Sequence, residues 1–307
     1  MSARDMLRSA FLYLSKQKKL EQLLLRCFLA RKLARRFVPG ENLADALEAA
    51  HSLKQRNTLA TLNHLGENVH TLAEASAARD AYLALIEEMA RRQLQANISV
   101  KLTQLGLDIS VPDCLENARR LAQSAERTGN FVRLDMESSA YTDRTLAAIG
   151  ELRQSGSPVG AVIQAYLYRS ENDVRRLLLQ GVRIRLCKGA YQEPPSLAFP
   201  RKKDVDQNYL RLMRMLLASG IYHGIATHDP RMIEETRRFA RQQQLAADSF
   251  EFQMIYGVRR DLQDRLVKEG YPLRVYIPFG KEWFPYFMRR LAERPANALF
   301  ALKAVLR

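Results

Sequence analysis

The stretch "NFVRLDM", residues 130–136, has the composition of a buried strand but carries a carboxylate near its end. Phe131, Val132 and Leu134 supply the apolar bulk of a strand that is covered on both faces. Asp135 follows them, and a carboxylate is costly in a protein interior unless other groups bind it. The stretch therefore predicts a buried strand. The carboxylate near its carboxyl end is either incidental or one member of a functional site.

Similar apolar stretches recur along the chain, and long helical patterns separate most of them. Strands that alternate with helices predict βα units and a parallel sheet. Eight units in about 250 residues match the count and size of a (β/α)8 barrel. A doubly wound sheet is the main alternative, and it is less favoured because no GxGxxG motif follows the first strand. The predicted strands are 58–66, 97–106, 130–136, 159–167, 181–191, 222–228, 250–257 and 273–280.

The composition indicates a sizeable core and a strongly basic protein. Apolar residues make up 47% of the 307 residues, and the net charge is +15. A positive balance favours acidic partners such as nucleic acid, anionic lipid or a phosphate-bearing cofactor. Charge alone does not choose among these partners, and an ordinary solvated basic surface explains it equally well.

The cysteines and the hydropathy bear on the compartment. There are three cysteines, at wide spacing and without a CxxC motif. This usage favours a reducing compartment and argues against a disulfide framework or a zinc ribbon. We find no signal-peptide pattern and no apolar run near the ~20 residues that a membrane helix needs. We therefore expect a cytoplasmic protein.

Residues 1–40 predict a basic helical arm, which precedes the predicted barrel at 41–307. Ten Lys or Arg and two Asp or Glu precede Gly40, and apolar residues between Leu20 and Phe37 follow helical spacing. The favoured interpretation is an amphipathic helix that packs on the main domain. The alternative is a membrane-surface or partner helix, which would place the protein peripherally at the inner face of the membrane.

Polar side chains lie at the carboxyl ends of all eight predicted strands, which is the end of a (β/α)8 barrel that carries the chemistry. Eight converging polar ends are hard to explain as packing. We therefore interpret Asp135 as one member of a polar ring, paired with Lys101 or Arg185. The ring comprises Asn63, Lys101, Asp135, Gln164, Arg185 with Lys188, Thr227 with His228, Gln253 with Tyr256, and Tyr276.

Two neighbouring loops are suited to a phosphorylated cofactor. "THDP" at 227–230 opens a predicted helix, and helix N-termini offer free N–H groups to phosphate. "KGAY" at 188–191 has small residues that let the backbone approach a ligand closely. The sequence has no GxSxG, no HExxH and no His and carboxylate cluster at metal-ligand spacing. A lone strand-end histidine such as His228 is more often structural than a ligand.

The motif "WFPYFMRRLAERPAN", residues 283–297, places Arg289 and Arg290 side by side on a helix that follows the eighth strand. Two guanidinium groups can bind a carboxylate in a bidentate manner. The alternative is an exposed basic helix in which Arg289 pairs with Glu293 at i,i+4. Spacing alone favours this alternative.

Seven motifs occur in this order: "SVKLTQLGLDIS", "FVRLDME", "QAYLYR", "RLCKGAY", "ATHDP", "FEFQMIYGVR" and "MRRLAERPAN". Together they resemble the motifs of the proline dehydrogenase family. The likeness is to bacterial monofunctional members and runs from about residue 57 to about residue 300. It implies a distorted (β/α)8 barrel with FAD at the carboxyl ends of the strands and the last barrel helix over the site. The implied reaction is oxidation of L-proline to 1-pyrroline-5-carboxylate with electron transfer to a quinone, the first step of proline catabolism.

The resemblance also implies catalytic and cofactor positions. Asp135 and Arg185 match catalytic positions of the family, and a positive group such as Arg185 near the flavin would stabilise its reduced, anionic form. Hydride leaves the proline carbon next to nitrogen for the flavin, so the protein positions the substrate and needs no nucleophile or metal. The positions that match the flavin site are Met136, Gln164, Lys188, Gly189, Ala190, Thr227 and His228.

On the substrate side, the resemblance implies that Arg289 and Arg290 hold the proline carboxylate and that Lys101 completes this clamp. Tyr256 and Tyr276 would form a wall against the pyrrolidine ring. One position departs from the family pattern, because Asn63 stands where the family commonly has Asp. The resemblance therefore assigns Asn63 no role.

Two other classes of function remain as alternatives. A Schiff-base aldolase or a pyridoxal-phosphate barrel, acting on a small carboxylate, could use Lys101 or Lys188. A nucleic-acid-binding protein is suggested by net charge only, since the sequence lacks an interleaved aromatic and basic pattern. Our expectation is therefore that the protein binds no nucleic acid.

Overall fold

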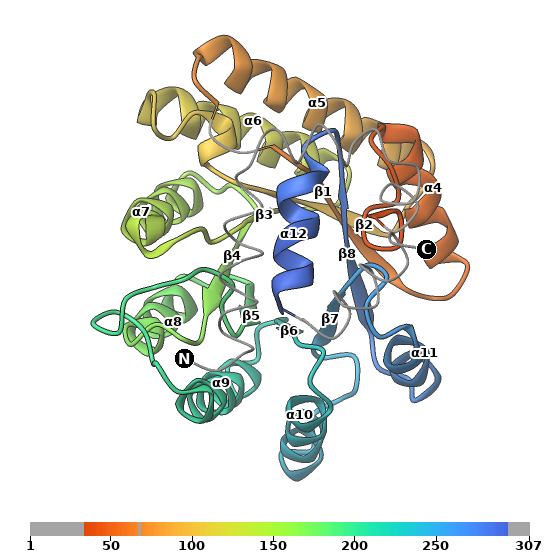
Figure 1. Cartoon of the computed structure of the whole chain (residues 1–307), viewed down its shortest axis with the longest axis vertical. Coiled ribbons are helices and arrows are strands. Elements are labelled where there is room, and N and C mark those ends of the chain that lie inside the picture. Colours follow the sequence, from red (N-terminus) through yellow and green to blue (C-terminus); the bar gives the residue numbers. More distant parts are fainter. Residues whose placement is uncertain (1–33, 67–68, 294–307) are drawn as a thin grey trace, which may run out of the picture.

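Eight parallel strands close into a barrel in the order of the sequence, and β8 pairs with β1 to complete it (Figure 1). The computed structural model describes residues 34–66 and 69–293. The predicted (β/α)8 barrel is confirmed. The strands are β1 (Leu59–His64), β2 (Ala96–Val100), β3 (Val132–Leu134), β4 (Val159–Gln164), β5 (Ile184–Cys187), β6 (Gly224–Ala226), β7 (Glu251–Ile255) and β8 (Leu273–Phe279).

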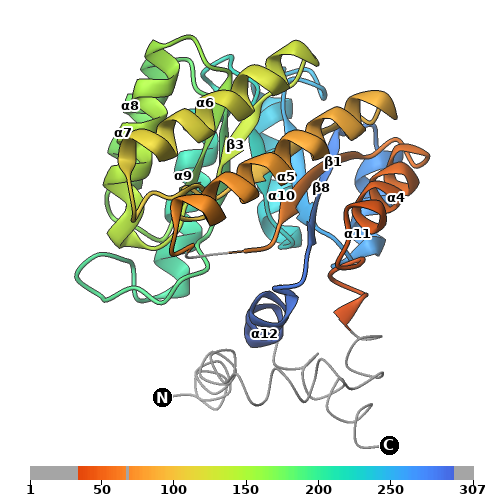
Figure 2. The same cartoon turned by 90° about the horizontal axis from the view of Figure 1, so that it is seen from above.

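Helices surround the barrel, and one of them lies across its end. Seven helices, α5 to α11, each connect one strand to the next, while α4 precedes β1 and α12 follows β8. Figures 1 and 2 show α12 over one end of the barrel, apart from the outer helices. The helices are α4 (Leu43–Lys54), α5 (Leu72–Arg91), α6 (Val111–Arg127), α7 (Ser139–Gln154), α8 (Ser170–Leu179), α9 (Lys202–Leu217), α10 (Pro230–Gln242), α11 (Arg260–Lys268) and α12 (Trp283–Glu293), with a short 3₁₀ helix at Thr103–Leu105.

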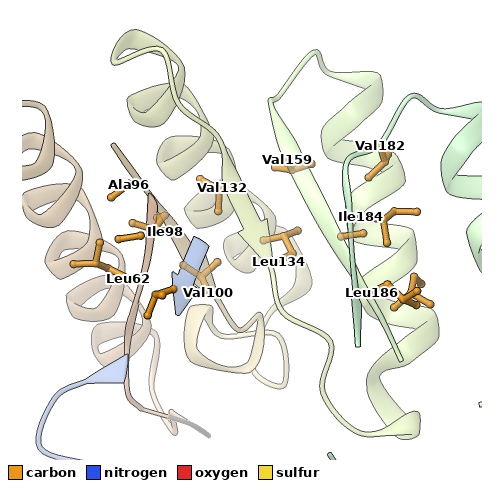
Figure 3. Close-up of a cluster of buried hydrophobic side chains, with 14 of the residues drawn as sticks. Leu62, Ala96, Ile98, Val100, Val132, Leu134, Val159, Val182, Ile184 and Leu186 are labelled. Carbon is orange, nitrogen blue, oxygen red and sulfur yellow. The ribbon is translucent and has the colours of Figure 1, made fainter. Parts of the chain in front are cut away.

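The apolar core lies mainly between the strands and the surrounding helices. Alternate strand residues, including Leu62, Ile98, Leu134 and Ile184, are almost fully buried in one large apolar cluster with helix residues. Figure 3 shows part of this layer across neighbouring strands. Because successive strand residues point to opposite faces, the residues between them point into the barrel.

The inward-facing positions are largely polar, in contrast to the branched apolar residues that usually fill such a barrel. Two glycines make room for the long polar side chains. A Cβ on Gly224 would lie 2.3 Å from Gln253 Nε2, and one on Gly160 would lie 3.1 Å from Arg133 Nη1. The buried inward-facing polar residues are Thr61, Asn63, Asn97, Ser99, Arg133, Gln164, Arg185, Glu251 and Gln253.

The strands are shorter than the sequence predicted. For 130–136 the strand spans only Val132–Leu134, and for 222–228 it spans Gly224–Ala226. The chain turns away from the ladder where the functional loops begin, although the Asp135 N–H still donates to Val100 O at 2.8 Å. Apolar content predicts where a strand runs but does not show where its ladder ends.

The last residues of the predicted arm pack against α12. Ala34, Phe37 and Val38 are buried in a second apolar cluster with Trp283 and Phe287. Residues 1–33 lie outside the described residues, so the predicted helical arm and its boundary at residue 40 stay predictions. Within the described part of the chain, no helix has both the length and the apolar character that crossing a membrane requires.

Candidate active site

A cavity of about 630 Å³ opens at the carboxyl ends of the strands. Pockets of roughly 300–1,000 Å³ are typical of cofactor and ligand sites. Residues predicted from strand ends, from both loops and from the arginine motif meet on its walls. They include Asp135, Arg185, Lys188, Thr227, Tyr276 and Arg290.

Asp135 is held by a charge pair and two hydroxyl groups. Arg185 Nη1 lies 2.8 Å from Asp135 Oδ1, and Ser99 Oγ donates to the same oxygen at 2.6 Å. Tyr276 Oη donates to Asp135 Oδ2 at 2.9 Å. Of the two partners that the sequence allowed, the direct one is Arg185. The buried carboxylate of Asp135 is therefore a member of the polar ring, and both of its oxygens accept hydrogen bonds.

Arg185 keeps one donor that no described residue accepts. Its Nε donates to Gln253 Oε1 at 2.5 Å and its Nη1 to Asp135. Its Nη2 is buried and has no hydrogen-bond partner among the described residues. An unsatisfied buried donor costs free energy, more so when the group is charged. Because Arg185 lines the cavity, its guanidinium group is suited to a bound ligand that carries a hydrogen-bond acceptor.

The "KGAY" loop has the close approach that its sequence predicted. Gly189 has φ of +124°, and a Cβ there would lie 2.4 Å from the ring of Tyr166. Only glycine suits this position. The N–H of Ala190 donates to Gln164 Oε1 at 3.3 Å, while Gln164 Nε2 donates to Glu137 O at 2.9 Å. Gln164 therefore connects the loop to the end of β3, where Met136 is buried.

The same loop is attached farther along to the start of α7. Glu193 Oε1 accepts from the backbone N–H of Ser139 at 2.7 Å, and Ser139 Oγ donates to Glu193 Oε2. The N-cap residue of α7, Ser138, makes no side-chain capping bond. Glu193 thus acts as the cap of α7 from a distant part of the chain, and a carboxylate is favourable at that end of a helix.

Lys188 lies between two carboxylates. Its Nζ is 2.6 Å from Asp206 Oδ1 and 2.8 Å from Asp229 Oδ2. Burial favours the neutral amine, but hydrogen bonds to the two carboxylates outweigh it and raise the pKa of Lys188. A Schiff-base lysine needs a lowered pKa, so the Schiff-base alternative is not favoured at Lys188.

The "THDP" segment lines the cavity next to Lys188. His228 Nε2 accepts from the N–H of Ile255 at 2.8 Å, which attaches the end of β6 to β7. The side chain of Asp229 caps α10 by accepting from the N–H of Arg231 at 3.1 Å. A phosphate at this helix end would therefore meet a carboxylate whose charge Lys188 neutralises.

A model of the family described as proline dehydrogenase matches residues 46–302. The chain belongs to the proline dehydrogenase family. Membership implies a flavin-dependent oxidoreductase that acts on proline in the first step of proline catabolism.

Two bacterial proteins match over nearly the whole chain. Proline dehydrogenase 1 of Bacillus subtilis (strain 168) is 40% identical over 302 residues, which cover 98% of this chain and 100% of the relative. Proline dehydrogenase of Deinococcus radiodurans is 41% identical over 313 residues, covering 98% of each.

A solved structure supports the fold. It is that of proline utilization A (PutA) from Bdellovibrio bacteriovorus inactivated by N-propargylglycine, with a TM-score of 0.82 and 26% identity. The match covers 87% of this chain and 33% of that one, so this proline dehydrogenase family member spans a third of the PutA chain.

Three cations, Lys101, Arg289 and Arg290, lie close together where α12 covers the barrel. Arg289 and Arg290 are half-buried, so the alternative of an exposed basic helix is wrong. Arg290 lines the cavity, and burial followed by the charge of Arg290 lowers the pKa of Arg289. Burial and the charge of Arg289 also lower the pKa of Lys101, to about 8, against the opposing charge of Glu137. Converging cations of this kind favour an anion such as a carboxylate.

Glu137 and Tyr191 were missed in the sequence, although both lie inside quoted motifs. Glu137 is buried and accepts from Thr103 Oγ1 at 2.8 Å. Burial, then the charge of Glu137, raises the pKa of Tyr191, and Arg289 opposes this effect. The two residues therefore belong to the cationic side of the site. The available signal was their position in the sequence. Glu137 lies two residues after Asp135, and Tyr191 directly follows the small residues of the loop.

Five predicted site residues are not among those that line the cavity: Lys101, Met136, Gln164, Tyr256 and Arg289. Tyr256 is half-buried against the apolar core, and the Arg260 guanidinium lies 5.9 Å from its ring centroid. Its backbone N–H donates to Tyr276 O at 3.0 Å. Asn63 is buried deeper and donates from Nδ2 to Ser99 O at 2.8 Å, which an ionised Asp could not do.

Proposed function

We propose that the protein catalyses FAD-dependent oxidation of L-proline to 1-pyrroline-5-carboxylate and passes the electrons to a quinone. The observation that carries this proposal is the charge pair of Asp135 and Arg185 on the wall of a cofactor-sized cavity, with Arg185 Nη2 buried and without a partner among the described residues. The family and the bacterial relatives supply the substrate.

The cofactor would be held by the two loops and the end of β4. Gln164 and the loop 188–190 would meet the flavin ring system, with Met136 as a further contact. Thr227 and His228 would meet its phosphate and sugar portion. When bound, the flavin supplies a hydride acceptor for the proline carbon next to the ring nitrogen.

The substrate would be oriented by charge. Arg289, Arg290 and Lys101 would bind the proline carboxylate, and Tyr276 would form the wall against the pyrrolidine ring. Asp135 and Arg185 would form the charge pair next to the reacting centre. Holding the carboxylate fixes the orientation of the ring carbon, and orientation of this kind supplies much of the catalysis in such a reaction.

An anaerobic absorption spectrum tests the proposal. The purified protein should show a flavin band that bleaches when L-proline is added and returns when a soluble quinone follows. D-proline is the matched control, since it should leave the band unchanged. A protein without a flavin band, or a band that L-proline does not bleach, would contradict the proposal. A band that returns with oxygen but not with quinone would contradict the acceptor alone.

We further propose that the basic arm makes a peripheral contact with anionic membrane. This proposal is supported only by the sequence of residues 1–40, whose positive charge and apolar spacing suit a membrane surface. Such a contact would bring the barrel close to a membrane quinone.

A further inference from the structure

A buried hydrogen-bonded chain leads from Arg185 into the interior of the barrel. Arg185 Nε donates to Gln253 Oε1, and Gln253 Nε2 donates to Glu251 Oε1, both at 2.5 Å. Arg274 Nε lies 2.7 Å from the same Glu251 oxygen. Gln253 is 4% exposed and Glu251 is 1% exposed, so water competes little for these contacts. We call Arg185, Gln253 and Glu251 the orienting chain.

The charge of Glu251 determines which way the Gln253 amide points. Burial raises the pKa of Glu251, but the charge of Arg274 and its hydrogen bond outweigh burial, and the net pKa is lowered. Glu251 is therefore ionised at neutral pH and can only accept hydrogen bonds. Gln253 must turn its NH₂ group toward Glu251, which leaves its carbonyl oxygen as the acceptor for Arg185.

The barrel provides space for this arrangement at one position. Gly224 faces Gln253 from the neighbouring strand, and a Cβ at Gly224 would lie 2.7 Å from Gln253 Cδ. Gly224 has no positive φ, so glycine is required there by space and not by backbone conformation. The absence of a side chain at Gly224 thus leaves the space that the side chain of Gln253 occupies.

The orienting chain fixes the plane of the Arg185 guanidinium. Gln253 binds its Nε, while Asp135 and Ser99 bind its Nη1 at 2.8 and 3.1 Å. A planar guanidinium bound at two of its nitrogens has little freedom left. Its remaining nitrogen, Nη2, is the one without a partner among the described residues.

We propose that Gln253, oriented by the Glu251 carboxylate, is a positioning residue that fixes Arg185 at the flavin site and so sets the reduction potential of the bound flavin. This inference rests on the proposed function. A positive charge held near a flavin favours its reduction, because reduction adds negative charge. Displacing Arg185 or adding a nearby negative charge should therefore make the potential more negative.

Gln253→Glu provides the sharpest test. Two carboxyl groups in contact cannot both be ionised easily, so one of them keeps a proton to raised pH. A protonated carboxyl group introduced by Gln253→Glu preserves both bonds of the amide, because its hydroxyl donates to Glu251 and its carbonyl accepts from Arg185. Loss of that proton adds a negative charge next to Arg185. Residue 253 contacts Arg185 and Glu251, and the charged groups next to these two residues are Asp135, Arg133 and Arg274.

The measurement is the flavin midpoint potential of the holoenzyme between pH 6 and 9, as the difference between variant and wild type. For Gln253→Glu we expect no difference at low pH and an increasingly negative difference at high pH. A tenfold fall in the equilibrium constant for flavin reduction corresponds to about 30 mV for a two-electron couple. A difference of zero across the whole range, in a variant that retains flavin, would overturn the proposal.

Gln253→Met and Gln263→Met form a matched pair. Both glutamines are 4% exposed, but Gln263 lies on α11 and donates to the backbone oxygens of Ile255 and Val258. We expect Gln253→Met to have a more negative potential and a flavin-reduction rate that is roughly tenfold lower at saturating proline, with less change in KM. Gln263→Met should lower the Tm and leave the potential unchanged. Equal potentials in these two variants would also overturn the proposal, whereas a wild-type protein without flavin would instead contradict the proposed function.

Discussion

Tyr276 donates its hydroxyl to Asp135 Oδ2 at 2.9 Å, and the guanidinium carbon of Arg185 lies 5.1 Å from the centroid of the same ring. The Tyr276 side chain therefore faces into the barrel and is fixed by the charge pair. Burial, then the charge of Asp135, raises the pKa of Tyr276 well above its usual value. The hydroxyl stays protonated and remains a donor throughout the physiological pH range.

Changing Tyr276 to Ser should reduce the preference for proline over 4-hydroxyproline. In the proposed site, the phenol leaves no room for a ring hydroxyl and offers it no well-placed partner. Serine opens space and supplies a small donor and acceptor, so kcat/KM for proline should fall and the ratio between substrates should shrink. Steady-state kinetics with both substrates measure this. Tyr276→Phe keeps the ring and should keep the ratio, and an unchanged ratio in Tyr276→Ser would refute the substrate-wall role.

Removing Arg289 or Arg290 should raise the KM for proline by roughly tenfold or more. A hydrogen bond to a charged group contributes roughly 1.5–3 kcal/mol, and the carboxylate would lose one in a site shielded from water. Arg260→Ala is a suitable control, because its guanidinium lies over Tyr256 and not at the cationic side of the site. If Arg289→Ala and Arg290→Ala both kept the wild-type KM, the clamp assignment would fail.

Lys101 should make carboxylate binding weaker at high pH. Its pKa is lowered to about 8, so the ammonium is present below that pH and is lost above it. Tetrahydrofuran-2-carboxylate has the shape of proline but no amine, so only protein groups titrate on binding. Its dissociation constant should be constant below about pH 8 and rise toward tenfold per pH unit above it. Titration of the flavin spectrum measures this, and Lys101→Met should remove the rise; a rise that persists in the variant would assign the effect to another group.

Glu193→Ala should weaken the retention of flavin. Glu193 ties the loop 188–201 to Ser139, and that loop carries Gly189 and Ala190 of the proposed flavin site. Loss of charge-assisted hydrogen bonds should raise the flavin dissociation constant about tenfold. Release of flavin fluorescence on dilution measures this constant.

The control for Glu193→Ala is Glu171→Ala, which breaks an ion pair to Arg211 at 2.9 Å between α8 and α9. This variant should change the Tm slightly and bind flavin as the wild type does. Equal flavin affinity in both variants would show that the contact between Glu193 and Ser139 serves stability only.

The arm should increase affinity for anionic vesicles. Co-sedimentation of the whole chain and of a chain lacking residues 1–38, with vesicles that contain phosphatidylserine, measures the difference. Binding should be stronger for the whole chain and should weaken as salt increases, because surface charges are screened. Equal binding of the two chains, or no binding by either, would reject the membrane contact.

Sequence reasoning predicted the barrel because its signals are local. Runs such as 159–167 and 273–280 show apolar strand character, and the polar residues at their ends indicate which end carries the site. Asp135 could be assigned to a polar ring because a carboxylate in an apolar run requires a partner. The sequence could not show whether Lys101 or Arg185 pairs with Asp135. This depends on how the strands that carry these residues lie in the folded barrel.

Other features needed the folded chain. The orienting chain joins Arg185 to Gln253, 68 residues away, and nothing near either residue predicts the contact. Glu193 caps a helix that begins 54 residues earlier. Tyr256 follows a strand as the other ring members do, but the chain turns after Ile255 and the ring packs elsewhere. The spacing of residues along the sequence does not predict such contacts, because they depend on the direction of side chains and on the path of loops.

The polar residues inside the barrel also disfavour strand pairings in the wrong register. A strand that slipped by one residue would turn its inner side chains outward and its outer ones inward. In β7 such a slip would move Glu251 and Gln253 into the layer that holds Phe252, and in β8 it would move Arg274 into the layer that holds Val275. The charges of Glu251 and Arg274 would then lie in apolar surroundings without a counterion. The free-energy cost would be far above that of an ordinary packing defect. The polar groups inside the barrel thus also make incorrect strand alignments unfavourable.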